Sequence, residues 1–124
     1  MAVHESGENY LETILILRER NGDVRSIDVA NELGFSKPSV SRAMGILKSE
    51  KLITMDIDGL IKLTEEGEAK AGAVLDRHMV ISAYLMKALD VESETATQDA
   101  CRMEHDISED TFGKMKQWLT SQAL

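Results

Sequence analysis

The stretch SIDVANELGFSKPSVSRAMGIL, residues 26–47, decides the fold because it predicts two short helices joined by a tight turn. Ser26 is suited to cap the first helix, and Gly34 can adopt the left-handed conformation that ends it. Ser36 is suited to cap the second helix, whose first turn accommodates Pro38 because a backbone N–H is not needed there. The stretch therefore predicts a helix-turn-helix.

The segments on either side of this motif extend it into a larger unit. Apolar residues recur at helical spacing over residues 6–20, which predicts a preceding helix. Two short β-prone runs over residues 52–63 flank Asp58-Gly59, a dipeptide suited to the positive φ angles of a tight hairpin turn. A helix-turn-helix followed by such a hairpin is typical of a winged helix.

The rest of the chain predicts helices only. Thr64 is suited to cap a long helix that runs to about Leu89, a shorter helix covers residues 93–105, and Ser108 is suited to cap a last one. We therefore predict a mainly α fold, in which an N-terminal winged helix-turn-helix with a small two-stranded wing precedes an α-helical domain.

The chain is acidic overall but basic around the second helix of the motif. Its 124 residues carry 14 Lys and Arg against 22 Asp and Glu, and the net charge of −8 argues against binding nucleic acid through overall charge. Residues 36–51 contain four basic residues against Glu50 alone, a local charge of +3. We recognise neither a signal peptide nor an apolar run of about 18 residues, so we expect a cytoplasmic protein that does not enter the membrane.

The local charge favours DNA as the partner of the helix that begins near Ser36. Hydroxyls and backbone N–H groups at its N-terminus would meet phosphates in the major groove, and Arg42 would reach base edges or the backbone. The candidate DNA-binding residues are Ser36, Lys37, Pro38, Ser39 and Arg42. The alternative is a small three-helix domain that binds only protein.

A second cluster of interest lies in the predicted helix over residues 93–105. Cys101, Glu104 and His105 stand at positions i, i+3 and i+4, which places all three within an arc of about 100°. Thiolate, carboxylate and imidazole are the side-chain types that bind transition metals. The alternative is ordinary packing, with Cys101 in the core, Glu104 solvated and His105 on an amphipathic edge.

Further donors favour the metal interpretation. Asn9 and Glu12 share a polar edge of the first predicted helix, and His78 interrupts the apolar stripe of the long helix. A hydrogen-bonded core histidine is the alternative for His78 alone, but beside the triplet it becomes a candidate ligand.

Five segments resemble the diphtheria-toxin-repressor family of metal-dependent bacterial repressors, over about residues 8–119: ENYLETILIL, SKPSVSRAM, IKLTEEGEAKA, DRH and DACRMEHDISED. The resemblance implies a winged-helix domain, a helical dimerisation domain and a divalent metal bound where the first helix meets the second domain. His78, Cys101, Glu104 and His105 match the metal ligands of that family by position.

The chain departs from both branches of the family. Cys101 matches the iron-regulating branch, Glu12 matches a ligand of the manganese-regulating branch, and Asn9 matches neither. Ser82 and Thr97 stand where the iron branch supplies the Glu and His of a second site. A soft thiolate favours Fe²⁺ over Mn²⁺, and Co²⁺, Ni²⁺ or Zn²⁺ would also satisfy this ligand set in vitro.

The resemblance implies a two-domain form, because the chain stops before the SH3-like domain of three-domain members. We expect residues 1–72 to form the DNA-binding domain and residues 73–124 to form the dimerisation and metal-binding domain. The expected partners are a double-stranded DNA operator and a second copy of the chain. The metal would act as co-repressor of metal-uptake genes by fixing the spacing of the two DNA-reading heads of the dimer.

Two rival functions use the same residues. A metalloenzyme would need a second acid or base or a recognisable catalytic motif, and the sequence offers neither, so we expect no enzymatic activity. The other rival is a winged-helix regulator that ignores metal, or one that senses redox state through Cys101.

Overall fold

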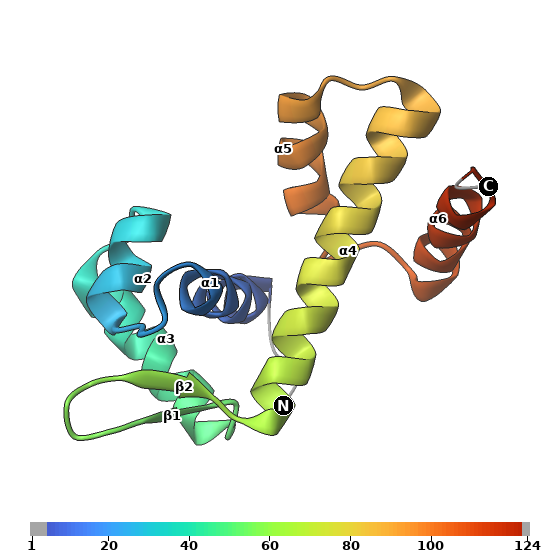
Figure 1. The fold of residues 1–124 in the computed structure, drawn as a ribbon. Helices are drawn as coiled ribbons and strands as arrows, with labels where there is room; N and C mark the ends of the chain where they lie inside the picture. Colours follow the sequence, from blue (N-terminus) through green and yellow to red (C-terminus); the bar gives the residue numbers. More distant parts are fainter. Residues whose placement is uncertain (1–4, 123–124) are drawn as a thin grey trace. The chain divides into compact units, whose positions relative to one another are not determined.

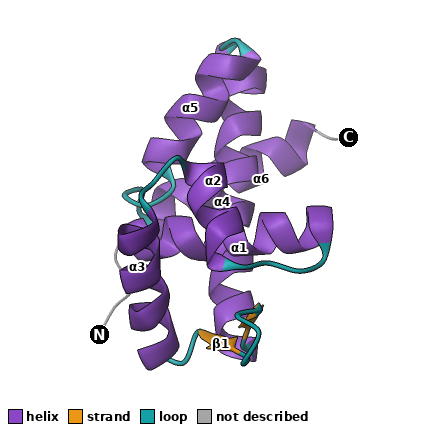
Figure 2. Cartoon of the chain, turned by 90° about the vertical axis from the view of Figure 1, so that its left-hand side faces the viewer, coloured by secondary structure: helices purple, strands orange, loops and turns teal. Residues whose placement is uncertain are grey.

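The structure, a computed structural model, describes residues 5–122 of the chain, so the expected domain limits at residues 1 and 124 lie outside it. Helices dominate, and the only strands among the described residues form one hairpin (Figures 1 and 2). The elements are α1 (Glu5–Asn21), α2 (Ser26–Leu33), α3 (Lys37–Ser49), β1 (Ile53–Met55), β2 (Ile61–Leu63), α4 (Glu65–Leu89), α5 (Ser93–Met103) and α6 (Glu109–Gln122). The predicted fold class is confirmed.

Contacts between Cα atoms divide the chain between Gly72 and Ala73 into two compact units. The first unit contains α1 to β2 and the start of α4, and the second contains the rest of α4 with α5 and α6. No helix among the described residues is both long enough and apolar enough to cross a membrane.

The core of the first unit collects the apolar faces that helical and strand periodicity predict. Helices α1, α2 and α3 contact one another, and the hairpin contacts both α1 and α3. Small Ala30 is buried where α2 lies against its neighbours, which permits close approach of the helices. The largest fully buried apolar side chains of this core are Leu11, Ile14, Val24, Val29, Val40, Met44, Leu52 and Ile53.

The helix-turn-helix confirms three of its four predicted signals, including Pro38 in the first turn of α3. Gly34 has φ of +70°, and its backbone N–H donates to the carbonyl of Ala30 at the end of α2. Ser36 is the N-cap of α3, where its hydroxyl accepts from the backbone N–H of Ser39. The predicted cap at Ser26 is wrong, since Ser26 is already the first helical residue and Arg25 takes the cap position.

The hairpin is a wing, but its turn differs from the two-residue turn that Asp58-Gly59 predicts. The backbone N–H of Asp56 donates to the carbonyl of Leu60, which leaves a three-residue loop, and within this loop only Gly59 has a positive φ, +81°. The Asp56 carboxylate accepts from the N–H groups of Asp58 and Leu60. This carboxylate stabilises the three-residue loop because it satisfies two backbone donors there.

The start of α4 is fixed to the wing. The hydroxyl of Thr64 caps α4 by accepting from Gly67 N–H, as predicted, and donates to the carbonyl of Lys51. A Cβ atom at Gly67 would collide with the carbonyl of Leu52, so only glycine permits this approach. Arg18 of α1 forms an ion pair of 2.8 Å with Glu68.

The second unit has a core of its own. Small Ala96 and Ala100 of α5 are fully buried and pack with Ile81 and Leu85 of α4. Around them lie the half-buried side chains of Met86, Val91, Met103, Ile107 and Met115. Ser108 caps α6 as predicted, because its hydroxyl accepts from the backbone N–H of Thr111.

Candidate metal centre and nucleic-acid interface

The packing of α5 explains where its ligand residues lie. Ala96, Ala100 and Glu104 are spaced by four residues, so they share one face of the helix. Because the two alanines pack against α4, the same face carries Glu104 into the interior, where its side chain is 0% exposed. Cys101 lies one residue off this face and is exposed. The packing alternative is therefore wrong for both residues, since Cys101 is not in the core and Glu104 is not solvated.

Helix α5 is shorter than predicted. The helix ends at Met103 rather than His105, and Glu104 occupies the C-cap with helical φ and ψ of −60° and −24°. The N–H of Glu104 still donates to the carbonyl of Ala100 over 2.9 Å. Cys101 and Glu104 therefore keep the i, i+3 relationship that brings their side chains together.

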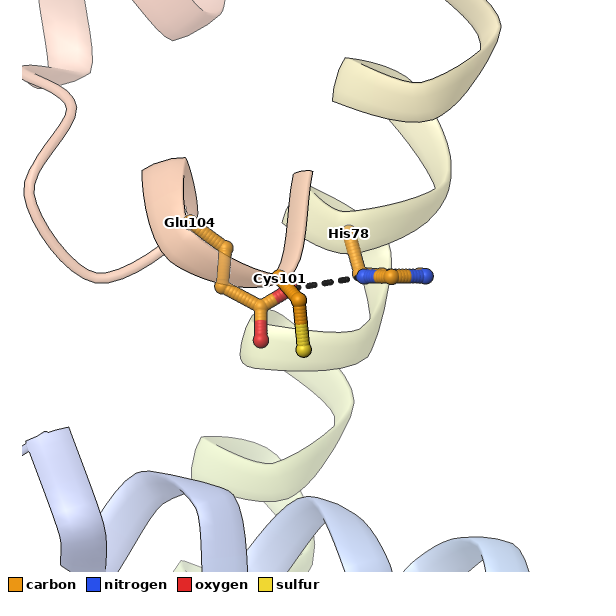
Figure 3. A group of neighbouring side chains, drawn as sticks. All are labelled: His78, Cys101 and Glu104. Carbon is orange, nitrogen blue, oxygen red and sulfur yellow. Dashed lines mark hydrogen bonds and ion pairs between the residues drawn. The ribbon is translucent and has the colours of Figure 1, made fainter. Parts of the chain in front are cut away.

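Three of the predicted ligands converge in the second unit. His78 of α4 faces the last turn of α5, and one donor atom each from His78, Cys101 and Glu104 can be chosen so that all lie within 4.8 Å of one another (Figure 3). A hydrogen bond of 3.0 Å joins His78 Nδ1 to Glu104 Oε2. The fourth, His105, has its Nε2 atom 3.3 Å from Glu104 Oε1 and a side chain that is 2% exposed.

This donor set fits a divalent transition metal. Bonds of about 2.0–2.3 Å hold pairs of donor atoms no more than about 4.6 Å apart, so the observed spacing requires little adjustment. Imidazole and thiolate suit Fe²⁺, Co²⁺, Ni²⁺ and Zn²⁺, and the carboxylate adds the negative charge that a cation needs. A carboxylate as deeply buried as that of Glu104 is costly unless charged or polar groups surround it, and the two imidazoles do so.

The remaining predicted ligands belong to α1, in the first unit. Asn9 is half-buried and Glu12 is buried, and they lie one helical turn apart. At the positions of the second site of the iron branch, Ser82 is buried and Thr97 is exposed. Hydroxyls are weaker ligands for transition metals than the carboxylate and imidazole that the resemblance implies for these positions in the iron branch.

The candidate DNA-binding residues form the exposed beginning of α3. Ser36, Lys37, Pro38, Ser39 and Arg42 are all exposed. The hydroxyls of Ser36 and Ser39 lie 2.9 Å apart and form a hydrogen bond within the cap, and each hydroxyl can act as donor or acceptor. The beginning of α3 thus presents two cationic side chains, a hydroxyl donor and helix N–H groups.

Sequence reasoning missed residues that adjoin this helix. A hollow of about 210 Å³ is lined by Ser26, Ile27, Lys37 and Ser41, which joins the N-terminus of α2 to the exposed face of α3. Arg25 donates from Nε to the carbonyl of Asp58 over 3.4 Å, linking α2 to the wing. The sequence signal for Arg25 was Asp28 three residues later, whose carboxylate accepts from the Arg25 backbone N–H.

Comparisons with known proteins agree with this arrangement. Residues 2–64 match the family described as iron dependent repressor, N-terminal DNA binding domain. Residues 64–121 match the family described as iron dependent repressor, metal binding and dimerisation domain.

Individual relatives include regulators named for manganese and for iron. The transcriptional regulator MntR of Escherichia coli O157:H7 is 36% identical over 105 residues, which cover 85% of this chain and 67% of MntR. The iron-dependent repressor IdeR of Mycobacterium tuberculosis H37Rv is 32% identical over 106 residues, 86% of this chain and 46% of IdeR. The structure of the manganese regulator SloR superposes with a TM-score of 0.81 at 26% identity, covering 97% of this chain and 55% of SloR.

The chain therefore spans about half the length of IdeR and of SloR. Both halves of the predicted resemblance are confirmed, since the family matches together extend over residues 2–121. The chain belongs to the diphtheria-toxin-repressor family of metal-dependent transcriptional repressors.

Proposed function

We propose that this chain is a DNA-binding transcriptional repressor whose affinity for its operator depends on a bound divalent transition metal. The observation that carries the proposal is the convergence of His78, Cys101 and Glu104, whose donor atoms lie within 4.8 Å of one another. The exposed basic beginning of α3 in the same chain supports it. So do the families that the chain matches, which are the domains of repressors rather than of enzymes.

The two parts of the chain have different roles in this proposal. Residues 1–72 form the DNA-binding domain, and residues 73–124 form the dimerisation and metal-binding domain. The active species is a homodimer on a double-stranded operator, with half-sites about one helical turn apart. Its targets are genes for metal uptake, and its location is the cytoplasm.

Fe²⁺ is the favoured metal and Mn²⁺ the second. The thiolate of Cys101 is a soft ligand, which Fe²⁺ accepts more readily than Mn²⁺ does, whereas Glu12 and Glu104 alone would suit either ion. Co²⁺, Ni²⁺ and Zn²⁺ would also bind in vitro. The proposed ligands are His78, Cys101, Glu104 and His105, with Asn9 and Glu12 as further donors.

The physical link to DNA is carried by α4. It is one continuous helix from Glu65 to Leu89, so the first turn, which packs on the wing, and His78 belong to the same element. A bound cation would supply two positive charges among carboxylates and fix its ligands relative to one another. A preference of about 1–3 kcal/mol for the DNA-competent conformer would already raise operator affinity by about 5- to 150-fold.

Operator binding measured with and without metal tests the proposal. An operator would first be selected from a random DNA library by the protein with Fe²⁺ under anaerobic, reducing conditions. Fluorescence anisotropy would then give the Kd of the wild type with Fe²⁺, with Mn²⁺ and with a chelator. We expect the metal to tighten binding at least about fivefold in the wild type and to leave Glu104→Ala unaffected.

A matched control removes a carboxylate elsewhere on α5. Glu94 is exposed in the first turn of that helix, and Glu94→Ala should respond to metal as the wild type does. Equal operator affinity of the wild type with metal and with chelator would overturn the proposal, as would a selection that enriches no sequence.

The second candidate is a regulator that ignores metal or senses redox state through Cys101. The exposure of Cys101 favours this alternative, because oxidants reach an accessible thiolate first. Peroxide would then change operator affinity in the presence of a chelator, and Cys101→Ser would abolish that response. If metal acts as proposed, the chelated protein binds the operator weakly whether or not peroxide is present.

A further inference from the structure

Arg77 lies next to His78 on α4 and reaches the segment that joins α5 to α6. Its Nη1 atom donates to the backbone carbonyl of Ile107 over 3.0 Å and lies 3.4 Å from that of Glu104. The last carbonyls of a helix have no partner within the helix, and that of Glu104 is one of them. Arg77 thus satisfies the backbone of a candidate ligand rather than its carboxylate.

Two residues of α6 also contact the guanidinium of Arg77. It forms an ion pair with Glu109, in the first turn of α6, and lies over the ring of Phe112 at 5.1 Å from the centroid. Its side chain is only 19% exposed. A planar guanidinium with five donors can satisfy several acceptors at once, and this one is fixed by carbonyls, a carboxylate and an aromatic face.

These contacts hold the turn that follows α5 against α4. Glu104 and His105 belong to that turn, and Glu104 faces His78, the residue next to Arg77. The distance between the two helices at this point is therefore set by Arg77 as well as by the side chains that would bind metal. Ligands whose backbone is already fixed lose less freedom when they bind.

We propose that Arg77 is a positioning residue that holds the Glu104–His105 turn in the arrangement that binds metal. The inference rests on the proposed function, because it assumes that Glu104 and its neighbours are ligands. Some residues orient a metal ligand without binding the metal themselves. Their replacement typically weakens metal affinity by about 10- to 100-fold. We expect a change of that size for Arg77→Gln.

Titration with Co²⁺ gives a direct measurement. Coordination by a thiolate produces an absorption band that reports on Cys101, so the Kd can be read from the whole 124-residue chain without DNA. Arg77→Gln should raise this Kd by about 10- to 100-fold. Arg77→Lys, which keeps the charge and one donor, should show a smaller increase. The circular dichroism spectrum of each metal-free variant should match that of the wild type.

Lys116 offers a matched control. Its ammonium lies 5.8 Å from the centroid of the same Phe112 ring and 3.3 Å from a carboxylate oxygen of Asp76. No hydrogen bond of the described structure joins Lys116 Nζ to the Glu104–His105 turn, so Lys116→Gln should leave the Kd for Co²⁺ unchanged. Glu109→Gln, which removes the ion pair but keeps Arg77 and its carbonyl bonds, should shift the Kd by less than Arg77→Gln does.

The possible results separate the two ideas. A wild type that shows no thiolate band with Co²⁺ would overturn the proposed function itself. A wild type that binds Co²⁺, with Arg77 variants of equal Kd, would overturn only the role of Arg77. An equal loss in Lys116→Gln would also overturn it, since any lost cation would then suffice. If Arg77→Gln does not fold, Arg77→Lys decides, and an unchanged Kd there counts against the inference.

Discussion

His78 Nδ1 lies 3.0 Å from Oε2 of Glu104, a residue 26 positions later in the chain, and the Glu104 side chain is completely buried at that contact. Helix α4 contributes the imidazole and the C-cap of α5 contributes the carboxylate, so the pair exists only when the two helices pack. Because Ala96 and Ala100 allow that packing, small apolar residues position a polar centre.

Metal should stabilise the protein against heat. A cation that binds only the folded state adds about 2.7 kcal/mol to the free energy of unfolding when its concentration is 100 times its Kd. The Tm of the wild type, measured by differential scanning fluorimetry, should therefore be several degrees higher with Co²⁺ than with a chelator. Glu104→Ala should show no such difference, and a wild type with the same Tm in both conditions would argue against a metal site.

Replacing Cys101 should change which metal the protein prefers. In Cys101→Glu the soft thiolate becomes a hard carboxylate, so affinity for Co²⁺ should fall by about tenfold or more while affinity for Mn²⁺ falls less or rises. Competition titrations with both ions in the wild type and the variant measure the ratio. Cys101→Ser is the control for loss of the thiolate alone. An unchanged ratio would mean that Cys101 does not select the ion.

The beginning of α3 should govern how operator binding depends on salt. Each lysine or arginine that contacts a phosphate contributes about 0.9 to the slope of log K against log salt concentration, so Lys37→Ala should lower that slope by about one. Arg42→Ala should cost about 1–3 kcal/mol and relax the preference at one base pair if Arg42 reads a base edge. Lys87→Ala, on α4 in the second unit, should change neither quantity.

Two glycines of α4 should respond in opposite ways to substitution by alanine. At Gly67 the new methyl group would strike the carbonyl of Leu52, and overpacking of this kind costs about 1–3 kcal/mol. At Gly72 nothing lies within 4 Å of the new atom, so the higher helix propensity of alanine should stabilise the helix by up to about 1 kcal/mol. Urea denaturation of both variants measures the difference, and equal effects would contradict the close approach at Gly67.

The ion pair between Arg18 and Glu68 should make stability depend on pH. Arg18 donates a hydrogen bond to the Glu68 carboxylate, which holds the pKa of Glu68 below the usual value for a glutamate and raises the pKa of Arg18. A carboxyl with a lowered pKa in the folded state contributes its stability fully above its unfolded pKa of about 4.3 and loses it as the pH falls through the folded value.

Glu68→Gln tests this dependence. The variant should be slightly less stable than the wild type at pH 7, and the difference should disappear as the pH approaches 3. The effect should be small and should weaken in high salt, because the pair is exposed. Glu66→Gln is the control, because it removes the same charge from the same turn of α4. If the stability of Glu66→Gln and Glu68→Gln depended on pH in the same way, the ion pair with Arg18 would have no specific role.

Local sequence signals determined the DNA-binding half of this protein. Gly34, Ser36 and Pro38 act within a single turn of backbone, so their effects can be predicted without knowing what packs against them. The same locality explains why the i, i+3 spacing of Cys101 and Glu104 predicted that their side chains lie within reach of one metal ion. The errors were local too: Asp56 lengthened the wing turn, and Asp28 moved the start of α2 from the predicted cap.

Only the tertiary structure decided which of the candidate ligands on α5 and at its C-cap are buried. Glu104 is inaccessible and Cys101 is exposed because contact with α4 covers one side of α5, and no spacing along α5 states where α4 lies. The contact of His78 with Glu104, and that of Arg77 with the backbone of the following turn, join residues about 26–30 positions apart. Such contacts form because two helices bury their apolar faces together, and burial of that kind is a property of the folded chain rather than of either segment.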